Sequence, residues 1–179
     1  MAAGSSKLSE RALIVLLAAC TGIGPVALNV YLPVLPKVRA DLGVSVAQAS
    51  VTVTAPLIAF AIGLLLYGPL SDRIGRRPVI LWGIAVCLAG TALALVAPNV
   101  TLLTAGRVIQ ALGTSAGLTV ARAMMGDLFP REKMARMIAY LTMVMVMANA
   151  VAPIAGGALG QWLHWRSVFA VVLVGVSFT

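Results

Sequence analysis

The sequence predicts an all-α integral membrane protein, and two observations lead to this prediction. Apolar residues make up 61% of the 179 residues, and the mean hydropathy is +1.04. That composition leaves too few polar residues to cover a soluble domain, whereas helices that face lipid need none on their outer side. The apolar residues also gather in runs of about 20, the helix length that crosses a bilayer core.

The apolar runs predict six membrane-spanning helices joined by short turns that contain Pro, Gly or Asn. The run after Arg166 ends at Thr179, which is too short to cross a bilayer. We therefore expect either a truncated last helix or a chain that continues beyond Thr179. After a tail over residues 1–11, residues 12–179 form the bundle, with spans over 12–36, 46–70, 79–97, 101–126, 137–160 and 166–179 or beyond.

Basic residues predict the orientation, because short loops rich in Lys and Arg stay in the cytoplasm. Eight lie in the tail and in the second and fourth turns, whereas three lie on the other side, at Lys37, Arg39 and Arg166. The N-terminus is therefore expected in the cytoplasm. Because the net charge of +8 is spread between apolar spans, it indicates topology and predicts no nucleic-acid partner.

The stretch "GPLSDRIGRR", residues 68–77, lies between the second and third spans and holds four charged residues. Its glycines allow a close helix approach and a tight reversal, and its aspartate can cap a helix or pair with an arginine. A plain positive loop does not require this pattern. The residues that make up this pattern are Gly68, Asp72, Arg73, Gly75, Arg76 and Arg77.

This stretch resembles the signature loop of the major facilitator superfamily, G-x-x-x-D-R-x-G-R-[RK], at every specified position. The resemblance implies a fold of 12 helices in two halves, each half built from two inverted three-helix repeats. It also implies that the loop is a conformational latch at the cytoplasmic side. The chain would then be the N-terminal six-helix half, with its sixth helix incomplete.

Further motifs resemble the branch of bicyclomycin and chloramphenicol (Bcr/CflA-type) exporters. They are "NVYLPVLP" at 29–36, "RVIQALGTSAG" at 107–117, "APIAGG" at 152–157 and "WRSVF" at 165–169. The resemblance implies export of drug-like molecules by proton antiport across the bacterial inner membrane. It implies no cofactor, membrane lipids as surroundings and a C-terminal six-helix half, covalent or separate, as partner.

Arg107 is the most informative single residue, because a charge inside a span is costly and normally faces a cavity or a partner. Gln110 follows it on the same helical face. We expect these two residues to bind substrate or to tune a protonation site, although Arg107 could instead reach the outer interface. Arg122 could pair with Asp127 or Asp72, or contact substrate.

Asn29 occupies a position where the resemblance implies that an Asp is common. Because Asn cannot titrate, the proton-carrying role does not transfer to it. The five acidic residues of the sequence lie outside the six predicted spans. If the protein exchanges drug for protons, its proton carrier therefore lies elsewhere, for example in a missing half. Asn29 and Tyr31 could bind substrate, or they could form a polar pair between helices.

In the fifth span, small residues recur every four positions and predict close helix packing beside a proline kink. The residues of this motif are Ala152, Pro153, Gly156 and Gly157. Packing alone accounts for them, and the link to export comes from the resemblance.

The sequence predicts no enzyme, because it shows no catalytic set, metal site or phosphate-binding loop. Two alternatives to a drug exporter stay open. One is an importer of sugars or metabolites from the same superfamily. The other is a truncated or half-length membrane protein that assembles but does not transport.

Overall fold

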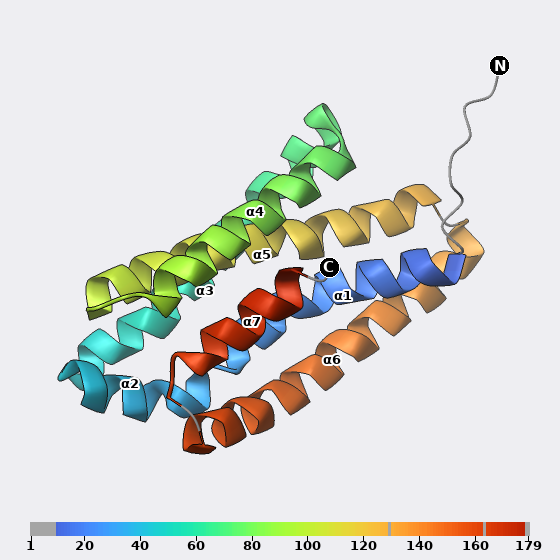
Figure 1. Cartoon of the computed structure of the whole chain (residues 1–179). Helices are drawn as coiled ribbons and strands as arrows, with labels where there is room; N and C mark the ends of the chain where they lie inside the picture. Colours follow the sequence, from blue (N-terminus) through green and yellow to red (C-terminus); the bar gives the residue numbers. More distant parts are fainter. Residues whose placement is uncertain (1–9, 129, 163, 178–179) are drawn as a thin grey trace.

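The computed structural model describes residues 10–128, 130–162 and 164–177, and within these residues it contains helices and no strands. This confirms the predicted all-α class. The elements are α1 (Glu10–Asn29), the 3₁₀ turn η1 (Leu32–Val34), α2 (Leu35–Leu42), α3 (Val46–Ile74), α4 (Arg76–Leu95), α5 (Val100–Leu128), α6 (Arg131–Trp162) and α7 (Ser167–Ser177) (Figure 1).

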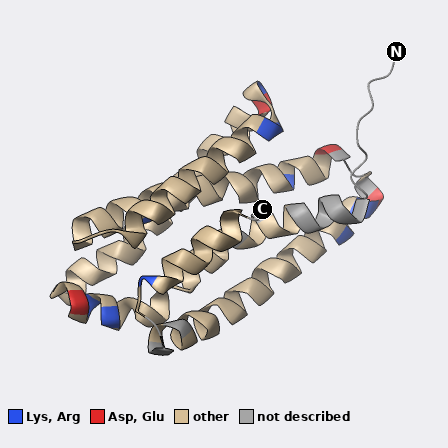
Figure 2. Cartoon of the chain, in the orientation of Figure 1, with Lys and Arg blue, Asp and Glu red and all other residues tan. Residues whose placement is uncertain are grey.

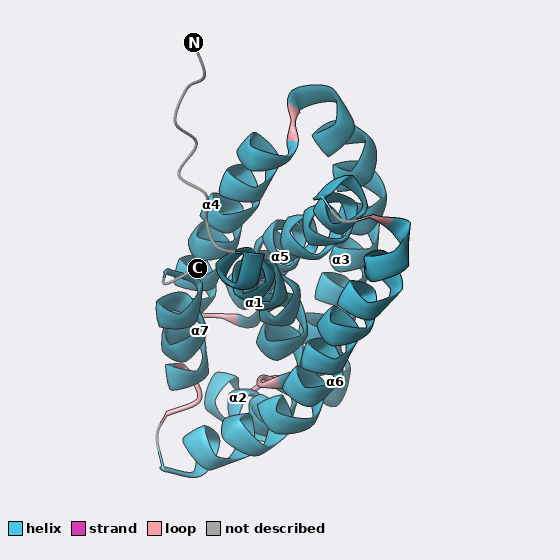
Figure 3. Ribbon diagram, turned by 90° about the vertical axis from the view of Figure 1, so that its right-hand side faces the viewer, coloured by secondary structure: helices cyan, strands magenta, loops and turns pink. Residues whose placement is uncertain are grey.

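The helices form one elongated bundle in which α1 and α5 lie centrally. Viewed end on, α4 and α7 lie on one side of this pair, and α3 and α6 lie on the other (Figure 3). Charged residues gather at the two ends of the bundle (Figure 2). The middle of the bundle is therefore the apolar layer that a membrane protein requires.

Four segments of the described chain are long and apolar enough to cross a membrane: Leu17–Leu42, Val46–Ile74, Arg76–Leu95 and Glu132–Ala158. Helix α7 is apolar but shorter, at 11 residues. Helix α5 has 29 residues but is less apolar, because polar residues such as Arg107 and Gln110 occupy its buried face. Its central position shields these side chains from lipid.

The first predicted span, 12–36, is broken in the structure and continues to Leu42. Helix α1 ends at Asn29, and the chain resumes as η1 and α2 after two non-helical residues. Pro33 and Pro36 follow the break, and proline has no N–H to extend the helical hydrogen bonds of the preceding turn. The break therefore leaves backbone carbonyls near the end of α1 open to side-chain donors.

The third predicted span, 79–97, begins earlier in the structure, because the loop between α3 and α4 is almost entirely helical. Helix α3 runs on to Ile74 and α4 starts at Arg76, so that Gly75 alone separates them. Gly75 has φ +96°, a conformation that glycine adopts readily and other residues avoid. The reversal therefore takes a single residue.

Helices α4 and α5 touch along a seam of four glycines spaced seven residues apart on each helix. A Cβ atom added at Gly113 would lie 2.6 Å from the Gly83 oxygen and 2.7 Å from the Cys87 Cα. One added at Gly106 would lie 2.6 Å from the Ala94 nitrogen. Such backbone-to-backbone packing is typical of membrane helices, where small residues permit close approach. The seam consists of Gly83, Gly90, Gly106 and Gly113.

Candidate functional site

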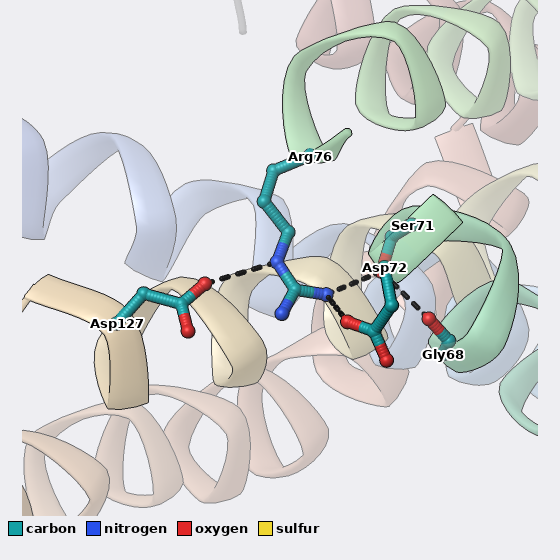
Figure 4. Close-up of polar contacts among 5 residues, drawn as sticks. All are labelled: Gly68, Ser71, Asp72, Arg76 and Asp127. Carbon is teal, nitrogen blue, oxygen red and sulfur yellow. Dashed lines mark hydrogen bonds and ion pairs between the residues drawn. The ribbon is translucent and has the colours of Figure 1, made fainter. Parts of the chain in front are cut away.

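The signature loop, residues 68–77, forms a compact charged cluster at one end of the bundle. Arg76 lies at the first position of α4 and faces the ends of two other helices. Its Nη1 lies 2.6 Å from Oδ1 of Asp72 on α3, and its Nε donates to Oδ2 of Asp127 on α5 over 3.0 Å (Figure 4). One guanidinium thus joins three helices.

A hydroxyl completes this cluster. Arg76 Nη1 also donates to Ser71 Oγ over 2.5 Å, and the Ser71 hydroxyl donates to the Gly68 carbonyl over 2.9 Å (Figure 4). Ser71 is buried, whereas the Asp72 and Asp127 side chains are 63% and 55% exposed. Exposed ion pairs contribute little to stability, so this cluster is suited to form and break at small cost.

The other basic residues of the loop play no such bridging part. Arg73 and Arg77 are exposed, and so is Arg122 on α5. Both carboxylates that we considered as partners of Arg122, Asp72 and Asp127, instead contact Arg76. The sequence did not single out Asp127 as part of the gate, although its position at the end of an apolar run was a usable signal.

Arg107 is 1% exposed and lies in the core rather than at an interface with solvent. Its Nη1 donates to the Ala27 carbonyl over 2.8 Å and to Gln110 Oε1 over 3.2 Å. The guanidinium carbon lies 4.2 Å from the centre of the Tyr31 ring and 5.9 Å from that of Phe169, both in the range of cation–π attraction. Arg107 therefore joins α5 to the break after α1.

The arginine is held without an opposing charge. Its Nε and Nη2 are buried and have no hydrogen-bond partner among the described residues. Its polar contacts are a backbone carbonyl and an amide oxygen, both neutral. Buried polar groups normally have hydrogen-bond partners. The Nε and Nη2 groups of Arg107 can therefore still donate hydrogen bonds to an acceptor that reaches the core.

Two threonines extend the network beyond the residues that the sequence indicated. The Tyr31 hydroxyl and Thr52 Oγ1 on α3 lie 2.8 Å apart, and Gln110 Nε2 donates to Thr91 Oγ1 on α4 over 2.9 Å. Both threonines are fully buried. The sequence shows only that each threonine lies inside an apolar run. That position does not distinguish a threonine that bonds Tyr31 or Gln110 from one that merely packs in the core.

Asn29 lies apart from this network and pairs with α6. Its Nδ2 donates to the Pro25 carbonyl and to Asn149 Oδ1, each over 2.9 Å. Asn29 is half-buried, and Asn149 is exposed on the described chain. Sequence analysis missed Asn149, although an amide in the middle of an apolar span was a visible signal.

The small residues of α6 lie against the break after α1. A Cβ at Gly156 would collide with the Val30 carbonyl group, whose carbon would lie at 2.8 Å, whereas one at Gly157 would lie 3.8 Å from Pro33 Cβ. Ala152 is 3% exposed and belongs to the adjoining core, and Pro153 lies inside the helix. The expected close packing is present, and Gly156 is its tightest point.

An apolar groove of about 440 Å³ lies between α1, α6 and α7. Its walls carry only Ala, Gly and Val side chains, such as Gly22, Ala148 and Val172. Within the described residues, no three His, Cys, Asp or Glu side chains gather as metal ligands would.

Comparison with known proteins gives a consistent family. The family model described as "Major Facilitator Superfamily" matches residues 16–178. The chain is 32% identical over 170 residues to "Multidrug resistance protein D" of Escherichia coli (strain K12), covering 93% of the chain and 43% of that protein. It is 36% identical over 154 residues to "Bicyclomycin resistance protein homolog" of Haemophilus influenzae, covering 85% of the chain and 38% of that protein.

Two further matches cover a similar part of the chain and of the matched proteins. The chain is 34% identical over 174 residues to "Chloramphenicol resistance protein" of Pseudomonas aeruginosa, with 96% of the chain and 41% of that protein covered. Among solved structures, "Crystal structure of D-xylose-proton symporter" matches with a TM-score of 0.77 at 15% identity, over 95% of this chain and 47% of that one. The chain therefore spans less than half the length of these relatives and has the fold of their N-terminal half.

Proposed function

We propose that this chain, which belongs to the Major Facilitator Superfamily, forms the N-terminal half of a bacterial exporter of drug-like molecules. The observation that carries a transport role is the Arg76 cluster, which joins the ends of α3, α4 and α5 through two exposed ion pairs. Such a cluster can hold one end of the bundle closed and release it when the two halves of a transporter rock against each other.

The direction of transport rests on the relatives. Three of them carry names that refer to resistance against several drugs, bicyclomycin or chloramphenicol. Resistance follows most simply from export, because it lowers the drug concentration inside the cell. The small residues of α6 pack tightly against the break after α1. This contact allows α1 and α6 to move as one unit.

Coupling to protons needs a group that titrates in the membrane. The acidic residues of the sequence lie at positions 10, 41, 72, 127 and 132, all near helix ends. Arg107 can raise the acidity of a nearby group but does not itself exchange protons readily. We therefore place the proton carrier in a second half, which would contact this chain through the face that carries Asn29 and Asn149.

The basic residues give the orientation. With the N-terminus in the cytoplasm, the Arg76 cluster lies at the cytoplasmic surface, and the end with Lys37, Asp41 and Trp165 lies at the outer surface. There the Trp165 indole donates to Asp41 Oδ2 over 2.8 Å, which joins the α6–α7 turn to α2. The inner membrane is the bilayer in which this arrangement of helices fits.

Transport by the protein from its complete reading frame tests the proposal. In a bacterium that lacks its main efflux pumps, we expect lower accumulation of chloramphenicol and ethidium than in cells carrying the empty vector. A protonophore should abolish the difference. Equal accumulation in both strains would refute export, and export that persists with the protonophore would refute proton coupling.

Sugar import is the second candidate, because one of the solved structures with this fold is "Crystal structure of D-xylose-proton symporter". At 15% identity that match concerns the fold and not the substrate. Uptake of labelled xylose by the same cells separates the candidates. An exporter should leave uptake at the level of the empty vector, whereas an importer should raise it without protecting against antibiotics.

A further inference from the structure

The amide pair Asn29 and Asn149 differs from the exposed serine and threonine hydroxyls of the described membrane segments. Exposed hydroxyls such as Ser50, Thr54 and Thr142 each donate to the carbonyl four residues earlier in their own helix. They can therefore face lipid without an unpaired donor. The two asparagines keep polar atoms that no described residue satisfies.

The orientation of both amides follows from their partners. A backbone carbonyl can only accept, so the group of Asn29 that faces the Pro25 carbonyl must be its NH₂. The same NH₂ donates to Asn149, which must present its oxygen. This leaves Asn29 Oδ1 as a free acceptor and Asn149 Nδ2 as a free donor among the described residues.

The pair lies near the middle of its membrane segments. Asn29 is central in Leu17–Leu42, and Asn149 is well inside Glu132–Ala158. Unpaired amide groups at this depth cost several kcal/mol against hydrocarbon, so the surface around them faces a second half or a water-filled path rather than lipid. Substrate sites of such transporters lie at this depth, between the halves.

The charge near the pair has a definite sign. Arg107 binds the Ala27 carbonyl, two residues before Asn29, and no carboxylate contacts it among the described residues. A buried guanidinium without a counter-charge repels other cations over a distance that low polarity extends. The acidic residues that could attract a cation lie near helix ends instead.

We infer that Asn29 and Asn149 form a neutral hydrogen-bonding subsite that selects uncharged molecules carrying an amide, carbonyl or hydroxyl group and discriminates against cations. The inference rests on the proposed export function and names its substrate class. The acceptor of Asn29 takes a donor of the substrate, and the donor of Asn149 takes an acceptor.

Two probes separate these properties. Chloramphenicol is neutral and carries an amide and hydroxyls, whereas tetraphenylphosphonium is a permanent cation without hydrogen-bonding groups. The protein from the complete reading frame should extrude chloramphenicol in preference to tetraphenylphosphonium. Asn149→Leu should weaken chloramphenicol recognition about threefold to tenfold, the effect of one lost hydrogen bond between neutral groups. Thr142→Val on the same helix is the matched control and should change it less than twofold, since its hydroxyl bonds its own helix.

A negative charge introduced at the other residue of the pair, Asn29, should have the opposite effect. Asn29→Asp should improve tetraphenylphosphonium recognition and lower the preference for chloramphenicol, because a carboxylate attracts the cation. Preference of the unchanged protein for tetraphenylphosphonium would overturn the inference. So would an Asn149→Leu variant that recognises chloramphenicol as well as the Thr142→Val control does.

Binding to the purified protein distinguishes failure of the subsite from failure of the proposed function. If neither probe is exported, export is wrong, and equilibrium binding of the same two probes then decides on the subsite. Tighter binding of chloramphenicol that Asn149→Leu alone weakens would support it. Equal binding of the two probes, or equal effects of the Asn149 and Thr142 variants, would refute it.

Discussion

The glycine seam between α4 and α5 makes a quantitative prediction about stability. In Gly113→Val, the new Cβ would lie 2.6 Å from the Gly83 oxygen, about 0.8 Å closer than the 3.4 Å of an ordinary contact. The obstacles are backbone atoms, which no rotamer change can move. The two helices must therefore separate, and Gly90 and Gly106, one heptad away on the same seam, lose contact as well.

Overpacking of a tight core costs about 1–3 kcal/mol and sometimes more, and a backbone obstacle belongs at the upper end of that range. A loss of about 3 kcal/mol corresponds to a fall of roughly 6–12 °C in melting temperature for a chain of this size. The measurement is the fraction of detergent-solubilised protein that stays monodisperse in size-exclusion chromatography after heating to a series of temperatures.

Gly126→Val is the matched control on the same helix. Gly126 is exposed, and its added Cβ would meet only the Met134 sulfur at 4.0 Å. This variant should melt within about 2 °C of the unchanged protein, since substitutions away from tight contacts usually change stability by less than 0.5 kcal/mol. Equal melting temperatures of the Gly113 and Gly126 variants would refute the close approach of α4 and α5.

The remaining predictions concern the signature loop, the contact between α6 and the break after α1, and the hydrogen bond between Trp165 and Asp41. Arg76→Gln should reduce drug extrusion about tenfold by removing both ion pairs, whereas Arg73→Gln, which loses the same charge, should stay within about twofold; equal losses would contradict the bridge. Gly156→Val should lower the melting temperature and Gly157→Val should not, because only the first meets backbone atoms closely, and a reversed order would be inconsistent with this packing. Trp165→Phe should destabilise the protein by about 2 kcal/mol, the loss of a hydrogen bond to a carboxylate, and an unchanged melting temperature would rule out that bond as a stabilising contact.

Local pattern was sufficient to predict the helical class and the place of the signature loop. Apolar runs set the helices, and the density of charge at residues 68–77 marked one end of the bundle. The same pattern could not show which arginine makes the bridge. Arg73, Arg76 and Arg77 are equivalent by type, and only the reversal at Gly75 aims Arg76 at both carboxylates.

The sequence could not predict the contacts between helices, because the partners lie far apart along the chain. Thr52, Thr91 and Asn149 lie 21, 19 and 120 residues from the side chains they contact. Each was one polar residue among several on an apolar helix, and the rotation of that helix decides which of them faces inward. The seven-residue spacing of the seam glycines was visible, but spacing on one helix does not identify its partner.

The break after α1 makes three contacts between helices possible. The break frees the Ala27 carbonyl for Arg107, places Tyr31 against Thr52, and lets α6 approach Val30 through Gly156. Asn29, which carries the free acceptor, is the last residue of α1 and immediately precedes the break. A straight α1 would keep the Ala27 carbonyl in its own helix and leave Arg107 with no backbone partner. The geometry of the amide pair and the burial of Arg107 therefore depend on the same two non-helical residues, so a movement of α2 relative to α1 would change the proposed subsite and the Arg107 charge together.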